Sequence, residues 1–248
     1  MKDYRKVTLE YYSKWLGQDE ILLHDFDGVR YLYSKERNKV PYGYGGAFDI
    51  YIFVMGSSVV VSYGDKAKER IDELQNKMAG RSVDEIKLLI KKIYEKKPKH
   101  NVKYVLHEIL TVDESVKVLT CEDYEKYEEF FRKCNPKCGS LGWLGEYFAE
   151  MVQEHICVGV FDNDILVSCT DAPGMAYMPE SVQEIGINTL PEYRGRGYAA
   201  KVCRKCVLKM IESGKIPQWS TSVDNIASQK LAEKTGFVKL ADVVTAEL

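Results

Sequence analysis

A short run of arginines and glycines around residue 195 has the composition of an anion-binding loop. The run is Pro191-Glu192-Tyr193-Arg194-Gly195-Arg196-Gly197-Tyr198-Ala199. It follows a pattern typical of a strand and opens one typical of a helix, so backbone N–H groups at the helix start are unpaired and point the same way. With the positive end of the helix dipole they form a site for phosphate, and the glycines let the backbone approach it closely. This spacing therefore predicts binding of a phosphate or pyrophosphate group.

Other phosphate-binding and nucleic-acid-binding motifs differ from this run. The P-loop would continue with Gly-Lys-Ser or Gly-Lys-Thr, and the dinucleotide-binding fingerprint needs three glycines. An Arg–Gly tract that binds RNA would be repeated and disordered, whereas this one occurs once, between ordered elements. The net charge of −2 gives no overall basic field that would favour a nucleic acid partner.

The cysteines do not form a recognisable metal site, although the chain contains seven of them. Cys203 and Cys206 make a C-x-x-C pair, but the pair lies in a helical pattern and no second pair follows at zinc-site spacing. Cys134 and Cys138 flank a short turn and have no histidine partner nearby in the sequence. We expect free thiols and no metal.

The elements that must position the loop alternate between strands and helices from residue 116 onward. Period-2 and period-3.6 apolar patterns distinguish the two types. Strands are predicted at residues 116–119, 155–161, 165–170, 183–190, 218–222 and 237–244, and helices at 121–134, 142–154, 198–213 and 225–235.

Residues 1–115 form a separate unit in this interpretation. Helices are predicted at 4–16, 67–79 and 82–94, and strands at 29–33 and 48–63 with a hairpin turn at Gly56. Ser82 and Glu85 suit a capping box. The lysine-rich run at 91–99 is interpreted as the solvated end of a helix. The fold class is therefore mixed α/β, with an N-terminal α+β domain at 1–115 and a second domain at 116–248.

The composition favours a cytosolic protein with ample material for a core, since 45% of the residues are hydrophobic. The most apolar stretch, residues 50–61, is short and interrupted by Gly56, Ser57 and Ser58, so no membrane span is predicted. The N-terminus lacks the apolar core of a signal peptide. We expect no membrane partner.

Two motifs in this order resemble the GNAT N-acetyltransferases. Arg194, Gly197 and Ala199 fill the family's Arg/Gln-x-x-Gly-x-Gly/Ala loop. Asn225-Ile226-Ala227-Ser228, followed by Gly236-Phe237, matches the later helix with its Asn-x-x-Ala/Ser motif. The resemblance covers roughly residues 116–248. The run 184–191 and the added N-terminal domain look like a bacterial two-domain group that includes zwittermicin-resistance-type acetyltransferases.

The resemblance implies a central sheet that splays apart after Thr189 and holds acetyl-CoA, as a co-substrate, in the gap. The pantothenate arm would pair with backbone groups of Ile187 and Thr189, and the pyrophosphate would lie on the loop amides. The acetyl group would pass directly to a primary amine of a small molecule. The implied cofactor-binding residues are Ile187, Asn188, Thr189, Arg194, Gly195, Arg196, Gly197, Tyr198, Ala199, Asn225 and Ser228.

Proton transfer needs a base for the ammonium and an acid for the leaving thiolate. Glu184, on the strand that leads into the loop, is the candidate base, because related enzymes use a carboxylate near this place. A one-residue error in strand register would turn it away from the cleft. Many relatives carry a tyrosine as acid where this chain has Ala232, so the acid is not identified.

Two other functions fit the same motifs. One is a catalytically silent acyl-CoA-binding or sensing module, and the other is a peptide or protein N-acetyltransferase. The first domain is expected to cover one side of the acceptor cleft, with Tyr31, Tyr33, Tyr42, Tyr44 and Tyr51 serving mainly as core residues. Residues 116–248 alone should then bind acetyl-CoA but lose turnover. The oligomeric state is not predicted.

Overall fold

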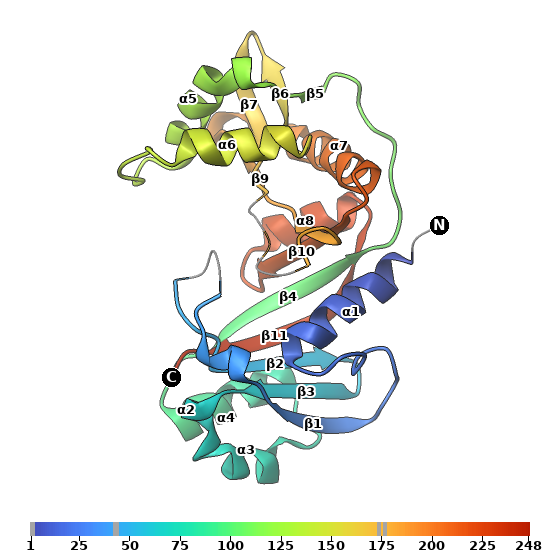
Figure 1. Cartoon of the computed structure of the whole chain (residues 1–248), viewed down its shortest axis with the longest axis vertical. Coiled ribbons are helices and arrows are strands. Elements are labelled where there is room, and N and C mark those ends of the chain that lie inside the picture. The colour runs from blue at the N-terminus through green and yellow to red at the C-terminus, as the bar shows by residue number, and fades with distance from the viewer. Residues whose placement is uncertain (1–2, 42–44, 173–174, 176–177) are drawn as a thin grey trace.

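The computed structural model describes residues 3–41, 45–172, 175 and 178–248 (Figure 1). The helices in this part are α1 (Tyr4–Leu16), α2 (Asp65–Lys68), α3 (Ile71–Met78), α4 (Val83–Tyr94), α5 (Tyr124–Cys134), α6 (Leu144–Gln153), α7 (Tyr198–Glu212) and α8 (Ile226–Lys234), with short 3-10 helices η1 (Lys35–Asn38), η2 (Cys121–Asp123) and η3 (Pro191–Tyr193). The strands are β1 (Gly28–Tyr33), β2 (Ile50–Met55), β3 (Ser58–Tyr63), β4 (Lys99–Leu106), β5 (Lys117–Val118), β6 (Val158–Asp162), β7 (Ile165–Thr170), β8 (Val182–Glu184), β9 (Ile187–Thr189), β10 (Ile216–Ser222) and β11 (Phe237–Ala246).

The larger sheet has seven described strands in the order β1-β3-β2-β11-β4-β10-β8. Strand alternation sends Tyr51 and Phe53 to one face, where α1 packs, and Ile50 and Ile52 to the other, where α3 and α4 pack. Local sequence determines where these helices begin. The carboxylate of Asp3 accepts the Lys6 N–H at the start of α1, and the predicted Ser82–Glu85 capping box opens α4.

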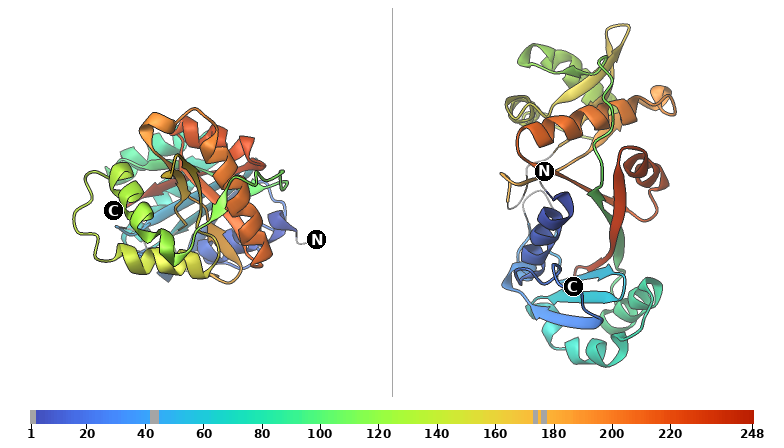
Figure 2. Two further views of the ribbon diagram at one scale, coloured as in Figure 1. Left: turned by 90° about the horizontal axis from the view of Figure 1, so that it is seen from above. Right: turned by 90° about the vertical axis from the view of Figure 1, so that its right-hand side faces the viewer.

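The smaller sheet has four described strands in the order β5-β6-β7-β9. Apolar side chains of α5 and α6 pack with this sheet and with α7 in one continuous core that reaches into β4 and β10 of the larger sheet. The views in Figure 2 show the two sheets stacked along the long axis of the molecule, with β4 and β11 passing between its halves. The mixed α/β fold class is thus confirmed.

The predicted boundary at residue 115 does not separate two sheets. Strand β4, for which the sequence pattern predicts no element beyond the lysine-rich run at 91–99, lies between β11 and β10 and is antiparallel to both. Val102 is opposite Thr221 of β10 on one side and Asp242 of β11 on the other. A central strand of the C-terminal half therefore comes from the N-terminal segment.

This pairing changes what we expect of a truncated protein. Removing residues 1–115 takes β2 and β4 away, which leaves β10 with one unpaired edge, β11 with two, and both with an uncovered apolar face. This state favours aggregation over folding. We expect the fragment 116–248 to show no cooperative thermal transition by circular dichroism. A fragment that keeps β4, residues 97–248, is the matched control and should recover a measurable transition. A cooperative transition in the shorter fragment would contradict the structural role given to β4.

Candidate functional site

Gly186 is the point at which one predicted strand changes sheets. Before it, β8 runs parallel to β10, and the Ile185 N–H donates to the Gln218 carbonyl at 3.0 Å. After it, β9 pairs with β7, and the Gly186 carbonyl accepts the Asp171 N–H at 2.7 Å. A Cβ on residue 186 would lie 2.2 Å from the Asp171 carbonyl oxygen, so only glycine fits this crossing. The sheet does splay as predicted, but it opens at Gly186 rather than after Thr189.

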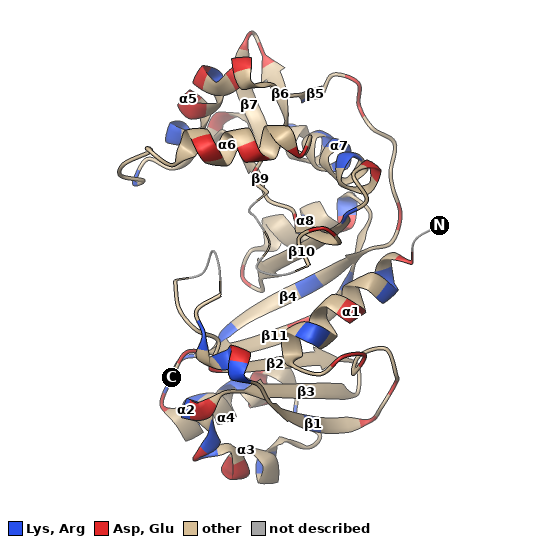
Figure 3. Ribbon diagram, in the orientation of Figure 1, with Lys and Arg blue, Asp and Glu red and all other residues tan. Residues whose placement is uncertain are grey.

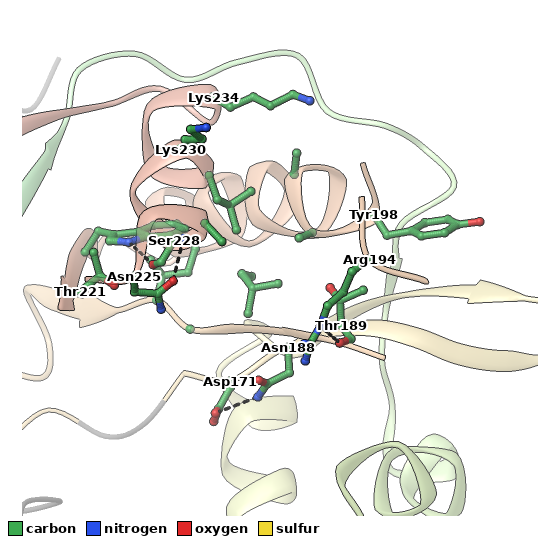
Figure 4. A pocket seen from close by; sticks show the side chains of 18 of the residues that line it. Asp171, Asn188, Thr189, Arg194, Tyr198, Thr221, Asn225, Ser228, Lys230 and Lys234 are labelled. Carbon is green, nitrogen blue, oxygen red and sulfur yellow. Dashed lines mark hydrogen bonds between the residues drawn. The ribbon is translucent and has the colours of Figure 1, made fainter. Parts of the chain in front are cut away.

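The gap between β9 and β10 widens into a cavity of about 850 Å³ (Figure 4). Its wall includes β9, the loop that follows it, the first turn of α7 and one face of α8. Ten of the predicted cofactor residues line it: Ile187, Asn188, Thr189, Arg194, Gly195, Gly197, Tyr198, Ala199, Asn225 and Ser228. Arg196 is not among the lining residues, and its guanidinium lies over the ring of Tyr193, 5.1 Å from the ring centroid.

Strand β9 presents backbone groups to this gap. The Asp171–Gly186 bond and the bond from the Leu190 N–H to the Val167 carbonyl, 3.0 Å, fix the register of the antiparallel pair. In an antiparallel pair, the backbone N–H and C=O groups of successive residues point alternately toward the partner strand and away from it. The backbone groups of Asn188 therefore point to β7, and the amides of Ile187 and Thr189 point to the open edge. Arg194 Nε donates to the Thr189 carbonyl at 3.1 Å, which ties the loop to the end of this strand.

The loop leads into α7 through two glycines with left-handed backbones. Gly195 has a φ of 76° and Gly197 a φ of 87°. A Cβ on either would meet no atom within 4 Å, so the backbone conformation, not crowding by the protein, calls for glycine. Gly197 is the N-cap of α7 and offers no side chain to the first-turn amides. These amides therefore point into the cavity without a protein cap.

The Asn-x-x-Ser motif has a structural part that the sequence did not reveal. Asn225 caps α8, its Oδ1 accepting the Ser228 N–H at 3.1 Å, and Ser228 Oγ accepts the indole N–H of Trp219 at 3.2 Å. Both side chains still line the cavity (Figure 4). Lys230 and Lys234 line it as well, and sequence analysis missed them. Helical periodicity counted onward from the motif would have found this face.

The sequence pattern also gave no sign of Asp171 and the two side chains that bond to it. Asp171 lines the cavity beside Gly186. The Oδ1 atom of Asp171 accepts a hydrogen bond from the phenol of Tyr147, which lies on α6. The Oδ2 atom accepts one from Asn188 Nδ2 at 3.2 Å. Burial and the neighbouring carboxylate of Asp171 raise the pKa of Tyr147 above its ordinary value. Tyr147 is therefore a neutral donor that fixes the carboxylate.

Glu184 lies at the end of β8, half-buried, and is not among the residues that line the cavity. Its charge acts on Tyr51 of β2. Burial raises the pKa of Tyr51 above its ordinary value, the Arg37 guanidinium counteracts this in part, and the carboxylate of Glu184 adds to it. Glu184 thus lies outside the cavity wall, and its role as the base stays a prediction.

The other predicted residues fall in several places. Tyr51 is a core residue as expected, Tyr31 is half-buried, and Tyr33 is 41% exposed. Tyr42 and Tyr44 lie outside the described residues. Ala232 is fully buried, and its methyl side chain supplies no acid. In the described part of the chain all seven cysteines are free, and no cluster of three or more His, Cys, Asp or Glu side chains suits a metal.

Comparison with known proteins gives the same family for the region that carries the cavity. Residues 146–242 match the model of a family described as GNAT acetyltransferase. A relative in Bacillus subtilis, the uncharacterized N-acetyltransferase YdfB, is 33% identical over 75 residues, which are 30% of this chain and 27% of YdfB.

Two solved structures are similar in fold. An acetyltransferase from the GNAT family of Colwellia psychrerythraea has a TM-score of 0.51 at 16% identity, over 63% of this chain and 60% of that one. A GCN5-related N-acetyltransferase from Sphaerobacter thermophilus has a TM-score of 0.51 at 12% identity, over 80% of this chain and 58% of that one. The match spans only part of each relative.

Proposed function

The chain belongs to the GNAT acetyltransferase superfamily through residues 146–242, and on this premise we propose that it transfers an acetyl group from acetyl-CoA to a primary amine of a small molecule. The observation that carries the proposal is the cavity that begins where the sheet opens at Gly186 and runs to the glycine loop and α7. Such a shape suits a long ligand with an anionic group at one end and a reactive group at the other.

The cavity chemistry supports one direction for the cofactor. The pyrophosphate lies on the first-turn amides of α7, where the helix dipole is positive, and Arg194 supplies further positive charge. Lys230 and Lys234 extend this cationic wall along α8. The pantothenate arm pairs with backbone groups of Ile187 and Thr189 and carries the thioester toward Gly186.

The reaction then needs few protein groups. The amine loses a proton to Glu184, through a water since Glu184 does not line the cavity, and its nitrogen attacks the thioester carbon. The C–N bond forms and the C–S bond breaks. The second proton that the attacking nitrogen carries then passes through water to the thiolate, because residue 232 is alanine and supplies no acid. A free amide at the open edge of β9 donates to the developing oxyanion.

The N-terminal segment supports a small acceptor. The charge of Glu184 reaches Tyr51 of β2 and helps to raise the pKa of that phenol, and on this ground we expect the N-terminal segment to border the side of the site where the amine arrives. The ribbon in Figure 3 shows acidic and basic residues interspersed along both halves, which does not favour a nucleic acid partner. No described helix is both long and apolar enough to span a membrane.

The function is tested in two steps. Acetyl-CoA should raise the melting temperature, since a ligand that binds only the native state stabilises it. Addition of a panel of primary amines should then release the CoA thiol, detected with a thiol reagent, and small amines should act faster than peptides. A melting shift without release for any amine would favour the sensing module, and faster release with peptides would favour a peptide N-acetyltransferase. An unchanged melting temperature would contradict the proposal.

A further inference from the structure

The cofactor cavity carries opposite charges on its two sides. Lys230 and Lys234 line the wall formed by α8, and neither pairs with a carboxylate in the described part of the chain. Asp171 supplies the sole carboxylate among the described residues that line the cavity. Figure 4 shows it on the opposite side from the two lysines, below β9. The cationic side suits phosphates, and the anionic side needs another partner.

Asp171 lies at the closed end of the gap. Its N–H bonds to the Gly186 carbonyl, and its own carbonyl oxygen would touch any Cβ placed on residue 186. The gap between β9 and β10 opens at this point. A cofactor whose phosphates lie on α7 therefore brings its thioester toward Asp171.

The carboxylate is fixed but its charge is not neutralised by the described residues. Both of its hydrogen-bond donors, the Tyr147 phenol and the Asn188 amide, are neutral. Two donors leave lone pairs free on both oxygens, so the carboxylate can accept from a third donor. The ring of Tyr147 packs edge-on against Trp143 at 5.7 Å, and Trp143 is 47% exposed, which adds an aromatic surface beside the charge.

We propose that Asp171 binds the ammonium group of the acceptor, and that the acceptor is a cationic alkylamine with an apolar or aromatic body that packs against Tyr147 and Trp143. This inference rests on the proposed function. It assigns separate tasks to two carboxylates: Asp171 positions the ammonium next to the thioester, and Glu184 receives its proton. A charged hydrogen bond and contact with an aromatic face both favour a cation over a neutral amine or alcohol.

The test uses benzylamine, which is an ammonium at neutral pH, and benzyl alcohol, a neutral molecule of similar size. Each is titrated calorimetrically into the full-length protein saturated with CoA. We expect saturable binding of benzylamine and at least roughly tenfold weaker binding of benzyl alcohol. Asp171→Asn should weaken benzylamine roughly 10- to 100-fold and leave benzyl alcohol unchanged, because only the charged contact is lost.

Control variants separate this inference from the function on which it rests. Glu146→Gln removes a neighbouring carboxylate of α6 that does not line the cavity, and should leave benzylamine binding unchanged. CoA affinity should be equal in all variants; absence of CoA binding in the wild type would contradict the function itself. Tyr147→Phe keeps the carboxylate of Asp171 but removes the phenol that holds it, so it should weaken benzylamine binding less than Asp171→Asn does. This variant tests the assignment if Asp171→Asn does not fold. Equal binding of benzylamine and benzyl alcohol, or no saturable benzylamine binding to the wild type, would overturn the assignment.

Discussion

Ala199→Glu is expected to abolish acetyl-CoA binding while the protein stays folded. Ala199 lies in the first turn of α7 and lines the cavity where the pyrophosphate is proposed to bind. A glutamate there suits the helix dipole, so the fold should not suffer. Its charge would face the phosphates, and like charges brought together cost several kcal/mol, or roughly 100-fold or more in affinity. The change in melting temperature on adding acetyl-CoA measures the effect.

Ala199→Gln is the matched control for this variant. Glutamine has nearly the same volume but no charge, so it should retain a substantial part of the melting shift. The first-turn position is a cleaner test than Gly197, where any side chain would also strain a backbone with a φ of 87°. If both variants lose the melting shift equally, the size of the side chain matters and its charge does not. If Ala199→Glu keeps the full melting shift, the pyrophosphate binds elsewhere.

Glu184→Gln is expected to reduce turnover strongly without affecting the cofactor. If Glu184 takes the proton of the amine, kcat should fall by roughly 10²–10⁴-fold, the usual contribution of a general base. The melting temperature and the affinity for acetyl-CoA should stay the same, because Glu184 does not line the cofactor cavity. Steady-state kinetics with thiol detection measures kcat and KM separately.

A less basic amine should recover part of the rate lost in Glu184→Gln, because it gives up its proton more readily. Glu180→Gln removes an exposed carboxylate from the same segment and should leave kcat unchanged. If Glu184→Gln weakens acetyl-CoA binding and leaves kcat intact, Glu184 is a structural residue of the strand. The proton of the amine would then pass to water or to Asp171.

The sequence by itself determined the features that depend on residues adjacent in the chain. The anion-binding loop is one: its strand end, glycines and helix start are consecutive, so their residue types were enough to predict unpaired amides with a positive dipole. The Ser82–Glu85 capping box and the hairpin turn at Gly56 are of the same kind, and the structure contains both. Such features form within one turn of chain and need no distant partner.

Tertiary structure alone decided which distant segments meet. Strand β4 pairs with β10 and β11 although more than a hundred residues separate them, and a period-2 pattern carries no information about its partner. The change of sheet at Gly186 depends on the close approach of Asp171, which the sequence of the strand does not contain. The Tyr147–Asp171–Asn188 contact joins α6, the end of β7 and β9 in the same way. The proposed acceptor end of the site depends on such long-range contacts, because only packing of whole elements brings these side chains within hydrogen-bond distance.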